Sequence, residues 1–584
     1  MQPKFWPQVL GAWGFAALVI MATTGAAWWS MSYPDPDDVL RLLEVRDLVG
    51  GQSWWDVDQH RFVSGHMHWS RLVDLPLAGV ELMLLPFFGQ AVTEHLTLAI
   101  VPLLTLLVVM ALIAHIARRL LDPEHAGYAL LLVPLSVPLI YQLRPMRIDH
   151  HGWQVVLGLA ALAALLRPRA DLRSGLLAGG SLAVLLTISL EGLPIAAALL
   201  GLAALAWALD PARRQQFAGA AAATFLGALA LHVATRGPGM FAPVCDAMAP
   251  VWLAVLGVAA VGAALAVQLG GKPLPLRLGA LGVVGVIALA TLYGVDPACA
   301  KGPFGSLNPV VRTLWYEKVS EGLPIWEQVP VWAVMMVGVP LVGIVGTIRA
   351  LRAAAPAQRA AWWLLLGATL AALALSLLVS RSAATANAFA IPGAAVIVLA
   401  LLKRARAIPR TLPRLAATAG ALVLAAPGIA AIPLLGMPEQ ERSPATQARL
   451  AHPTFLPCRG PKEPLDLQAL PAATLFAPID IAPEIVAGTH HRAITSGHHR
   501  NADAMRDVML AFTGSPEQAR ATMARYGATY VVGCPSSIET ELYQDVAPHG
   551  FWARLEQGER FPWLRRVPIR GSRVLAWQVV IPLS

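Results

Sequence analysis

Carboxylate and histidine side chains recur in a few polar segments that separate long apolar stretches of the sequence. Asp37 follows the first apolar stretch, Asp149 and His151 follow the third, and Glu321 follows the ninth. Carboxylate oxygens and imidazole nitrogens suit Mg²⁺ or Mn²⁺ as ligands. These four side chains are therefore candidate ligands of a divalent metal.

Arginines accompany the candidate metal ligands. Arg144 and Arg147 precede Asp149, and Arg381 follows the eleventh apolar stretch. A guanidinium group binds a phosphate ester through two parallel hydrogen bonds. Together these residues indicate a metal-assisted site for a phosphorylated lipid. The alternative is that the loop carboxylates only solvate helix ends.

The apolar stretches that must position these residues dominate the composition. The chain has 584 residues, of which 56% are hydrophobic and 14% charged, whereas soluble domains are about 45–50% apolar and about 25% charged. This composition excludes a soluble enzyme and predicts a polytopic α-helical membrane protein with about 13 transmembrane helices. The expected spans are 8–30, 93–116, 126–143, 151–166, 174–190, 194–209, 217–234, 250–268, 278–295, 330–348, 361–380, 386–402 and 415–434.

Basic residues fall in alternate connections, which sets the expected orientation. Lys and Arg accumulate in cytoplasmic loops, so the pattern predicts a cytoplasmic N-terminus, as in a bacterial-type inner membrane protein. The net charge of +9 then reflects topology and contact with membrane lipid, and it does not favour nucleic acid as a partner. A cleaved signal peptide is the alternative for the first stretch, which is long for one.

An odd number of spans places the C-terminal region outside, in the periplasm. We expect a transmembrane domain over 1–434, with a first exported loop over about 31–92, and an exported α/β domain over 435–584. Segments 474–479 and 528–533 are typical of buried strands, and 501–513 and 516–526 have helical periodicity. Ser515 with Gln518 predicts a capping box, and Gly527 a helix end.

Four cysteines are expected on the exported side. An oxidising compartment permits disulfides, and the plausible pairs are Cys245 with Cys299 and Cys458 with Cys534. The sequence leaves three connectivities open, and free buried thiols are the other alternative.

In this layout the chain resembles the catalytic subunits of oligosaccharyltransferases, in the glycosyltransferase-C superfamily. That family has thirteen spans and an exported C-terminal domain. The resemblance matches the family's first-loop catalytic Asp to Asp37, with Asp35 as the fallback, and its Asp-x-Asp-like motif to Asp149-His150-His151. The family's Ser-Val-Ser-Glu motif matches Lys318-Val319-Ser320-Glu321, and its arginine beyond the eleventh span matches Arg381.

One family motif is not matched. The place of Trp-Trp-Asp-Tyr-Gly is taken by Ala477-Pro478-Ile479-Asp480-Ile481-Ala482, which keeps one Asp and loses the pocket that, in the family, recognises Asn-x-Ser/Thr acceptors. Nearby polar residues are candidates for contact with donor phosphate or acceptor, and zinc binding by the histidines is an alternative. The candidate contact residues are Asp480, His490, His491, His498, His499 and Arg500.

The resemblance implies a glycosyltransferase that moves a sugar or oligosaccharide from a polyprenyl phosphate or pyrophosphate carrier to a protein, lipid or glycan acceptor at the outer face. It implies an inverting reaction assisted by Mg²⁺ or Mn²⁺, with Asp37, Asp149 and Glu321 catalytic, and an acceptor other than an Asn-x-Ser/Thr sequon. One alternative is a metal-independent enzyme that uses a polyprenyl monophosphate sugar to modify lipid or polysaccharide. Two further alternatives are a transporter of lipid-linked saccharides and an inactive binding protein.

Overall fold

The computed structural model describes residues 4–305, 307–436, 463–535 and 537–580. The chain forms two compact units. The membrane unit comprises Met1–Trp29, Trp69–Gly305 and Ser320–Met437, and the α/β unit comprises Ser30–His68, Ser306–Val319 and Pro438–Ser584. The sequence predicts a boundary near residue 434, but the α/β unit also takes in part of the first exported loop and a short segment before Glu321.

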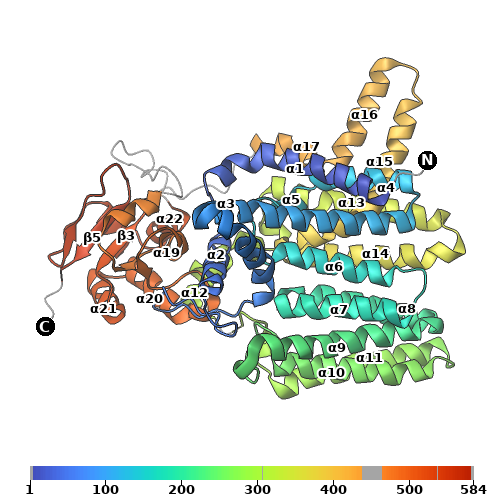
Figure 1. Cartoon of the computed structure of the whole chain (residues 1–584), viewed down its shortest axis with the longest axis horizontal. Helices are drawn as coiled ribbons and strands as arrows, with labels where there is room; N and C mark the ends of the chain where they lie inside the picture. The colour runs from blue at the N-terminus through green and yellow to red at the C-terminus, as the bar shows by residue number, and fades with distance from the viewer. Residues whose placement is uncertain (1–3, 306, 437–462, 536, 581–584) are drawn as a thin grey trace. The chain divides into compact units, whose positions relative to one another are not determined.

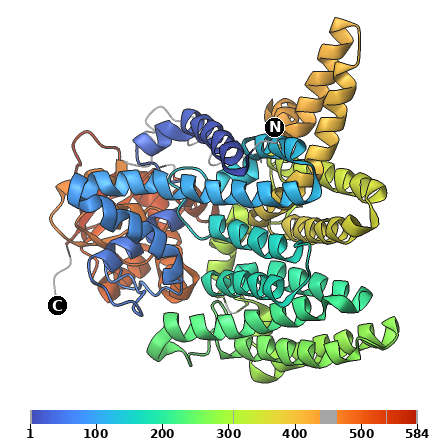
Figure 2. The same cartoon turned by 45° about the vertical axis from the view of Figure 1, so that its right-hand side comes forward.

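Long apolar helices make up the membrane unit (Figures 1 and 2). Proline at the first helical position begins several of them, where its missing N–H costs nothing. The helices are α1 (Phe5–Trp29), α3 (Arg71–Leu120), α4 (Pro123–Leu132), α5 (Val137–Tyr141), α6 (His151–Leu165), α7 (Leu172–Ile188), α8 (Leu193–Leu209), α9 (Arg214–Arg236), α10 (Pro250–Ala266), α11 (Leu274–Val295), α13 (Pro330–Ala353), α14 (Pro356–Leu378), α15 (Ala383–Arg406), α16 (Thr411–Ala425) and α17 (Pro427–Ala431).

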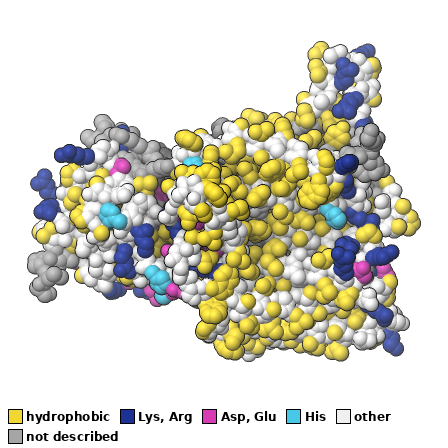
Figure 3. Space-filling model, viewed as in Figure 1, with side chains coloured by type: hydrophobic (Ala, Val, Ile, Leu, Met, Phe, Trp, Pro, Cys, Tyr) yellow, Lys and Arg dark blue, Asp and Glu magenta, His cyan; other side chains and the backbone are white. Residues whose placement is uncertain are grey.

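The helices confirm the expected polytopic architecture. Among the described residues, nine helices are long and apolar enough to cross a membrane, one bent pair at 411–435 makes a tenth, and three shorter apolar helices lie at His125–Leu135, His151–Leu165 and Leu172–Ile188. Each corresponds to one of the predicted stretches. Hydrophobic side chains cover much of the face that these helices present in Figure 3. The chain is therefore a multi-pass membrane protein.

One predicted span begins earlier than expected. The stretch 93–116 belongs to α3, which starts at Arg71 and passes through a break at Gly89, where φ is 69°. Glycine adopts this left-handed conformation without steric cost. The N-terminal part of α3 contains Asp74 and Glu81, so the segment lacks the uninterrupted apolar pattern that identified the other spans.

Glycines allow close helix packing in the membrane unit. A Cβ on Gly346 would lie 1.9 Å from the Gly393 carbonyl oxygen, and one on Gly393 would lie 2.2 Å from the Gly343 carbonyl oxygen. The α13 and α15 backbones therefore touch, as small residues permit in membrane bundles. This packing holds α15 against α13, and α15 begins at Ala383, two residues after Arg381.

The α/β unit contains a five-stranded sheet in the order β2-β1-β3-β5-β4, in which β2, β1 and β3 are parallel and β5 and β4 are antiparallel additions. The strands are β1 (Thr474–Phe476), β2 (Arg492–Ala493), β3 (Tyr530–Gly533), β4 (Leu564–Arg566) and β5 (Leu575–Val579), and the helices are α2 (Pro36–Val49), α12 (Pro309–Leu314), α19 (Ala482–Gly488), α20 (Ala502–Thr513), α21 (Pro516–Tyr526), α22 (Ile538–Val546) and α23 (Phe551–Glu556).

Local sequence signals in this unit are confirmed. Ser515 and Gln518 form the expected capping box at α21, and Gly527 ends that helix in the left-handed conformation, with φ of 66°. Phe476 of β1 packs with Phe512 of α20 in a core that α21, α22 and α23 complete. Apolar periodicity and capping residues thus specified these elements locally.

Candidate functional site

Five of the candidate residues lie in one cluster of the membrane unit, which we call the acidic–histidine cluster. Its members are Arg147, Asp149, His150, His151, Glu191, Glu321 and Arg381. They come from the start of α6, the α7–α8 connection, the segment before α13 and the α14–α15 connection. All these connections follow or precede apolar helices, so packing of the helices brings the polar loops together.

The histidines of the cluster lie between carboxylates. His150 Nδ1 is 2.7 Å from Asp149 Oδ1, and His150 Nε2 is 3.2 Å from Glu191 Oε2. His151 Nε2 lies 3.4 Å from Asp149 Oδ2 and 3.6 Å from Glu321 Oε1. His150 therefore links two carboxylates, and His151 faces two more carboxylate oxygens.

Arginines neutralise the buried acids of this cluster. Arg147 Nη2 donates to Glu321 Oε2 at 3.2 Å, and its Nε donates to Gln142 at 3.0 Å. Arg381 donates to Glu191, and its Nη1 also lies 3.6 Å from Glu321 Oε1. The two arginines thus hold opposite sides of the acidic group.

A short backbone contact positions Glu321. Ser380 Oγ donates to the carbonyl oxygens of Ser320 and Glu321 at 3.1 and 3.0 Å, and Ser380 N donates to the Leu323 carbonyl oxygen at 3.1 Å. Ser380 directly precedes Arg381. The same turn therefore fixes both the carboxylate and the guanidinium group that faces it.

Neighbouring charged groups shift the pKa values of His150 and Glu321 in the cluster. Burial alone would lower the pKa of His150, but the negative charge and hydrogen bond of Asp149, with Glu191, raise it to about 10. Burial would raise the pKa of Glu321, yet the positive charges of Arg381 and Arg147 hold that pKa well below its usual range. His150 is thus a cation and Glu321 a carboxylate near neutral pH.

His151 fits a metal ligand better than a structural histidine. Its side chain is 3% exposed, and neither ring nitrogen forms a hydrogen bond within the described part of the chain. Buried polar atoms normally find hydrogen-bond partners, so this orphaned imidazole indicates a missing ligand. Asp149 and His151 belong to a buried group whose possible ligand atoms lie within 4.8 Å of one another.

Arg144 lies apart from the ion pairs. Its guanidinium carbon sits over the Tyr141 ring, 4.4 Å from the ring centroid, and among the described residues no ion pair joins it to a carboxylate. Arg147 also contacts the Tyr141 ring, 5.6 Å from its centroid, so the two arginines share this aromatic side chain, but Arg147 alone of the two is ion-paired among the described residues.

Asp37 belongs to the α/β unit. It lies in the first turn of α2, where Asp35 caps the helix by accepting a hydrogen bond from Asp37 N at 2.9 Å. Carboxylates are favoured at a helix N-terminus. The two alternatives from the sequence therefore differ in role, because Asp35 serves as the cap and Asp37 follows it.

Asp480 lies in a second acidic group, in the α/β unit. Glu539 accepts hydrogen bonds from the backbone N–H groups of Ile479 and Asp480 at 2.9 and 2.8 Å, and Tyr543 donates to Glu539. Burial and the charge of Asp35 raise the pKa of Asp480 to about 6. Burial and the charge of Asp480 raise the pKa of Glu539 to about 8.

The four histidines near Asp480 separate into two pairs. The ring Nε2 atoms of His490 and His491 lie 2.9 Å from the carbonyl oxygens of Leu470 and Leu467, which is a structural use. His498 and His499 instead face His68. Arg500 Nη1 donates to the Met67 carbonyl oxygen at 3.1 Å, so it holds the backbone.

The structure joins Cys245 and Cys299 by a disulfide. Both cysteines belong to the membrane unit, on either side of the α10–α11 hairpin. The other expected pair includes Cys458, which lies outside the described residues.

No sequence pattern by itself assigns a role to Glu191 or His150. Glu191 was visible as a lone charge between two apolar stretches, and intramembrane charge is a signal of function. His150 was visible within the Asp149 motif, but its bridging position depends on the contact with Glu191. His68 gave no local signal.

The fold of the chain is similar to that of solved oligosaccharyltransferase structures. An oligosaccharyltransferase of Archaeoglobus fulgidus, AglB, in complex with an inhibitory peptide and a dolichol-phosphate, matches with a TM-score of 0.65 and 16% identity over 95% of this chain and 72% of that one. An A. fulgidus oligosaccharyltransferase tethered to an acceptor peptide with an NVT sequon matches with a TM-score of 0.64 and 15% identity over 100% of this chain and 75% of that one. The complex of that enzyme with Zn and sulfate matches with a TM-score of 0.58 and 16% identity over 89% of this chain and 67% of that one.

No protein-family model matches the sequence, and no curated protein matches it. The likeness therefore shows the fold, as the resemblance predicted.

Proposed function

We propose that the protein is a glycosyltransferase that moves a sugar or oligosaccharide from a polyprenyl phosphate or pyrophosphate carrier to an acceptor at the outer face of the membrane. The observation that carries this proposal is the acidic–histidine cluster, in which buried His151 faces Asp149 and Glu321 and, among the described residues, neither of its ring nitrogens forms a hydrogen bond. Its location at the ends of apolar helices suits a lipid carrier.

The residues of the cluster fit a divalent metal. Asp149, His151 and Glu321 would hold the ion, with Mg²⁺ or Mn²⁺ favoured by the carboxylates. A bound metal would supply Lewis-acid neutralisation of the departing phosphate. The oligosaccharyltransferase of A. fulgidus has a structure with Zn and sulfate, which supports metal binding by a protein of this fold.

The arginines and Asp37 take complementary roles in the proposal. Arg147 and Arg381 bind the phosphate oxygens of the donor, since a guanidinium group pairs with a phosphate through parallel charge-assisted hydrogen bonds. An acceptor nucleophile attacks the anomeric carbon as the bond to the carrier oxygen breaks. Asp37 orients the acceptor and takes its proton, and a single displacement inverts the anomeric configuration.

The proposal places the protein in a bacterial-type inner membrane with the N-terminus in the cytoplasm and the α/β unit in the periplasm. The acceptor is a protein, lipid or glycan other than an Asn-x-Ser/Thr sequon, because Asp480 lies in a segment without the tryptophans of the family motif. Asp480 and the histidines that follow it are the candidate acceptor contacts.

A second candidate rests on the ion pairs of the cluster. Arg147, Arg381 and His150 already offset the charges of Asp149, Glu191 and Glu321. That balance favours a metal-independent transferase that uses a polyprenyl monophosphate sugar.

Purified protein in lipid nanodiscs, supplied with polyprenyl-linked sugars and an acceptor fraction from the host membrane, tests both candidates. The leading proposal expects donor consumption that EDTA abolishes and Mn²⁺ or Mg²⁺ restores. Consumption that resists EDTA supports the second candidate. No consumption of any polyprenyl-linked donor contradicts both.

A further inference from the structure

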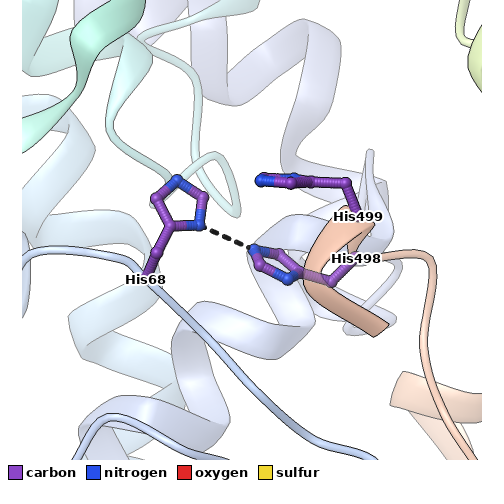
Figure 4. A group of neighbouring side chains, drawn as sticks. All are labelled: His68, His498 and His499. Atoms are coloured by element: carbon purple, nitrogen blue, oxygen red, sulfur yellow. Dashed lines mark hydrogen bonds between the residues drawn. The ribbon is translucent and has the colours of Figure 1, made fainter. Parts of the chain in front are cut away.

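Three histidines of the α/β unit converge outside the acidic–histidine cluster. His68 ends the segment that precedes α3, and His498 and His499 lie in the turn before α20. Figure 4 shows the three rings facing a common space. Their ligand nitrogens lie within 4.8 Å of one another. We infer that His68, His498 and His499 form a binding site for a transition-metal ion of the Zn²⁺ type, which we call the three-histidine site.

The distance between two of the rings suits shared coordination. His68 Nδ1 lies 3.0 Å from His498 Nε2. Zn–N bonds of about 2.0–2.1 Å in tetrahedral geometry separate two ligand nitrogens by about 3.3 Å. A shift of a few tenths of an ångström therefore converts the hydrogen bond between the rings into two bonds to one metal ion.

The same contact distinguishes a metal site from an anion site. A hydrogen bond between two imidazole nitrogens requires one nitrogen to carry the proton and the other to lack it. Two imidazolium rings at this distance would repel each other. The pair thus has a neutral imidazole, the form that binds metals.

Other contacts hold the two segments in register, although about 430 residues separate them in the sequence. The Asn501 side chain accepts hydrogen bonds from Ser64 Oγ at 3.0 Å and His66 N at 2.9 Å, and it donates to the His66 carbonyl oxygen at 3.1 Å. Arg500 donates to the Met67 carbonyl oxygen. These bonds fix the backbone on both sides of the histidines.

A second set of contacts holds the residues that precede His68 and His498 in the chain. Val63 N donates to the Ala493 carbonyl oxygen at 2.9 Å, and Ser64 N donates to the Ile494 carbonyl oxygen at 2.8 Å. A Cβ on Gly497 would lie 3.1 Å from Trp315 Nε1, so the turn that carries His498 packs closely against Trp315. The ligand geometry is therefore organised before any metal binds.

The partial exposure of two of the rings predicts a metal site in which one coordination position is left for a ligand from outside the protein. His498 is 3% exposed, whereas His68 and His499 are half-buried. Three protein ligands with a fourth position left for water or another oxygen ligand are typical of exchangeable zinc sites. An all-imidazole ligand set favours Zn²⁺ over Mg²⁺ or Mn²⁺, which distinguishes this site from the carboxylate-rich cluster of the membrane unit.

Metal titration of the full-length protein tests the site apart from any activity. The parent carries Asp149→Asn and His151→Ala, so that the acidic–histidine cluster does not contribute. After removal of metal by a chelator, Zn²⁺ binding is measured by equilibrium dialysis with elemental analysis, and the visible spectrum of bound Co²⁺ reports the ligand field. We expect one Zn²⁺ per chain in the parent, unaffected by excess Mg²⁺.

Substitutions of His68 and His499 test whether the two segments bind the same metal ion. His68→Ala and His499→Ala each lower Zn²⁺ affinity at least tenfold and change the Co²⁺ spectrum, while thermal unfolding of the metal-free protein stays the same because these rings are half-buried. His490→Ala, which removes a nearby histidine that contacts a backbone carbonyl, leaves Zn²⁺ binding unchanged. The inference is overturned by a parent that binds no Zn²⁺, by unchanged affinity in both variants, or by equal loss in His490→Ala.

Discussion

Arg147 Nη2 donates a hydrogen bond to Glu321 Oε2 at 3.2 Å across 174 residues of sequence. The Arg147 side chain is 1% exposed and that of Glu321 is 18% exposed. This pair connects the segment before α6 to the segment before α13. It brings together two loops that the sequence marked separately as candidates for one reaction.

Removal of Arg147 should destabilise the protein. Arg147→Ala leaves the Glu321 carboxylate with less compensation, and breaking a buried pair costs about 3–5 kcal/mol. Because Glu321 retains some exposure, we expect a loss towards the lower end of that range in reversible SDS unfolding. Arg144→Ala is the matched control, since Arg144 lies over the Tyr141 ring, a contact worth about 0.5–1 kcal/mol, and has no ion pair among the described residues. Equal losses in the two variants would contradict the role of the Arg147–Glu321 pair.

His151 should matter for metal binding more than for folding. His151→Ala removes a side chain whose ring nitrogens form no hydrogen bond among the described residues. We expect Mn²⁺ affinity to fall at least tenfold, as measured by electron paramagnetic resonance titration, with a small change in unfolding. His232→Gln serves as a control because His232 hydrogen-bonds to the Met240 carbonyl oxygen, outside the cluster. Unchanged Mn²⁺ affinity in His151→Ala would remove this residue from the ligand set.

Glu539 should make stability depend on pH. Burial and Asp480 raise its pKa from 4.5 to about 8, so the folded protein holds a proton that the unfolded chain releases. Stability is therefore greatest at acidic pH and falls as pH rises from about 4.5 through about 8. Asp480, with a pKa raised to about 6, adds to this slope.

The matched variant is Glu539→Gln, which keeps the hydrogen-bonding shape and removes the charge. Thermal unfolding followed across this pH range should show a flatter profile for the variant than for the wild type. Profiles that run parallel over the whole range would show that Glu539 does not carry the dependence.

The Cys245–Cys299 disulfide should stabilise the α10–α11 hairpin. The two cysteines are 54 residues apart, and a loop of that length gives up to about 4 kcal/mol in the chain-entropy account. We expect Cys245→Ser to lower the unfolding midpoint, and we expect dithiothreitol to shift the midpoint of this variant less than it shifts that of the wild type. A wild-type midpoint that does not respond to reduction would contradict a stabilising disulfide.

Local patterns predicted the helices, and tertiary contacts decided the site. Apolar length identified the spans, and Ser515 and Gln518 specified a helix start through neighbours three residues apart. The charges at Asp149 and Glu321 stood out because the surrounding sequence is apolar. In contrast, the role of Glu191 depends on Arg381 and His150, which reach it only through packing of α6, α8 and α15.

The three-histidine site shows the same difference. His498 and His499 were conspicuous as a pair, but nothing near His68 in sequence indicates that it lies beside them. That proximity depends on hydrogen bonds from Asn501 and Arg500 to residues 64–67. Side chains that bind distant backbone leave no periodic signal in the sequence.

The rate of sugar transfer from a polyprenyl-linked donor in Asp149→Asn and Glu321→Gln protein, compared with Arg144→Ala, tests the central claim most directly. Charged groups aimed at a reacting centre contribute about 10²–10³-fold, so we predict losses of at least that size in the first two variants, with normal folding by size-exclusion chromatography. Arg144→Ala should stay within a few fold of the wild type. Wild-type transfer rates in both well-folded cluster variants would contradict the assignment of the acidic–histidine cluster as the reaction site.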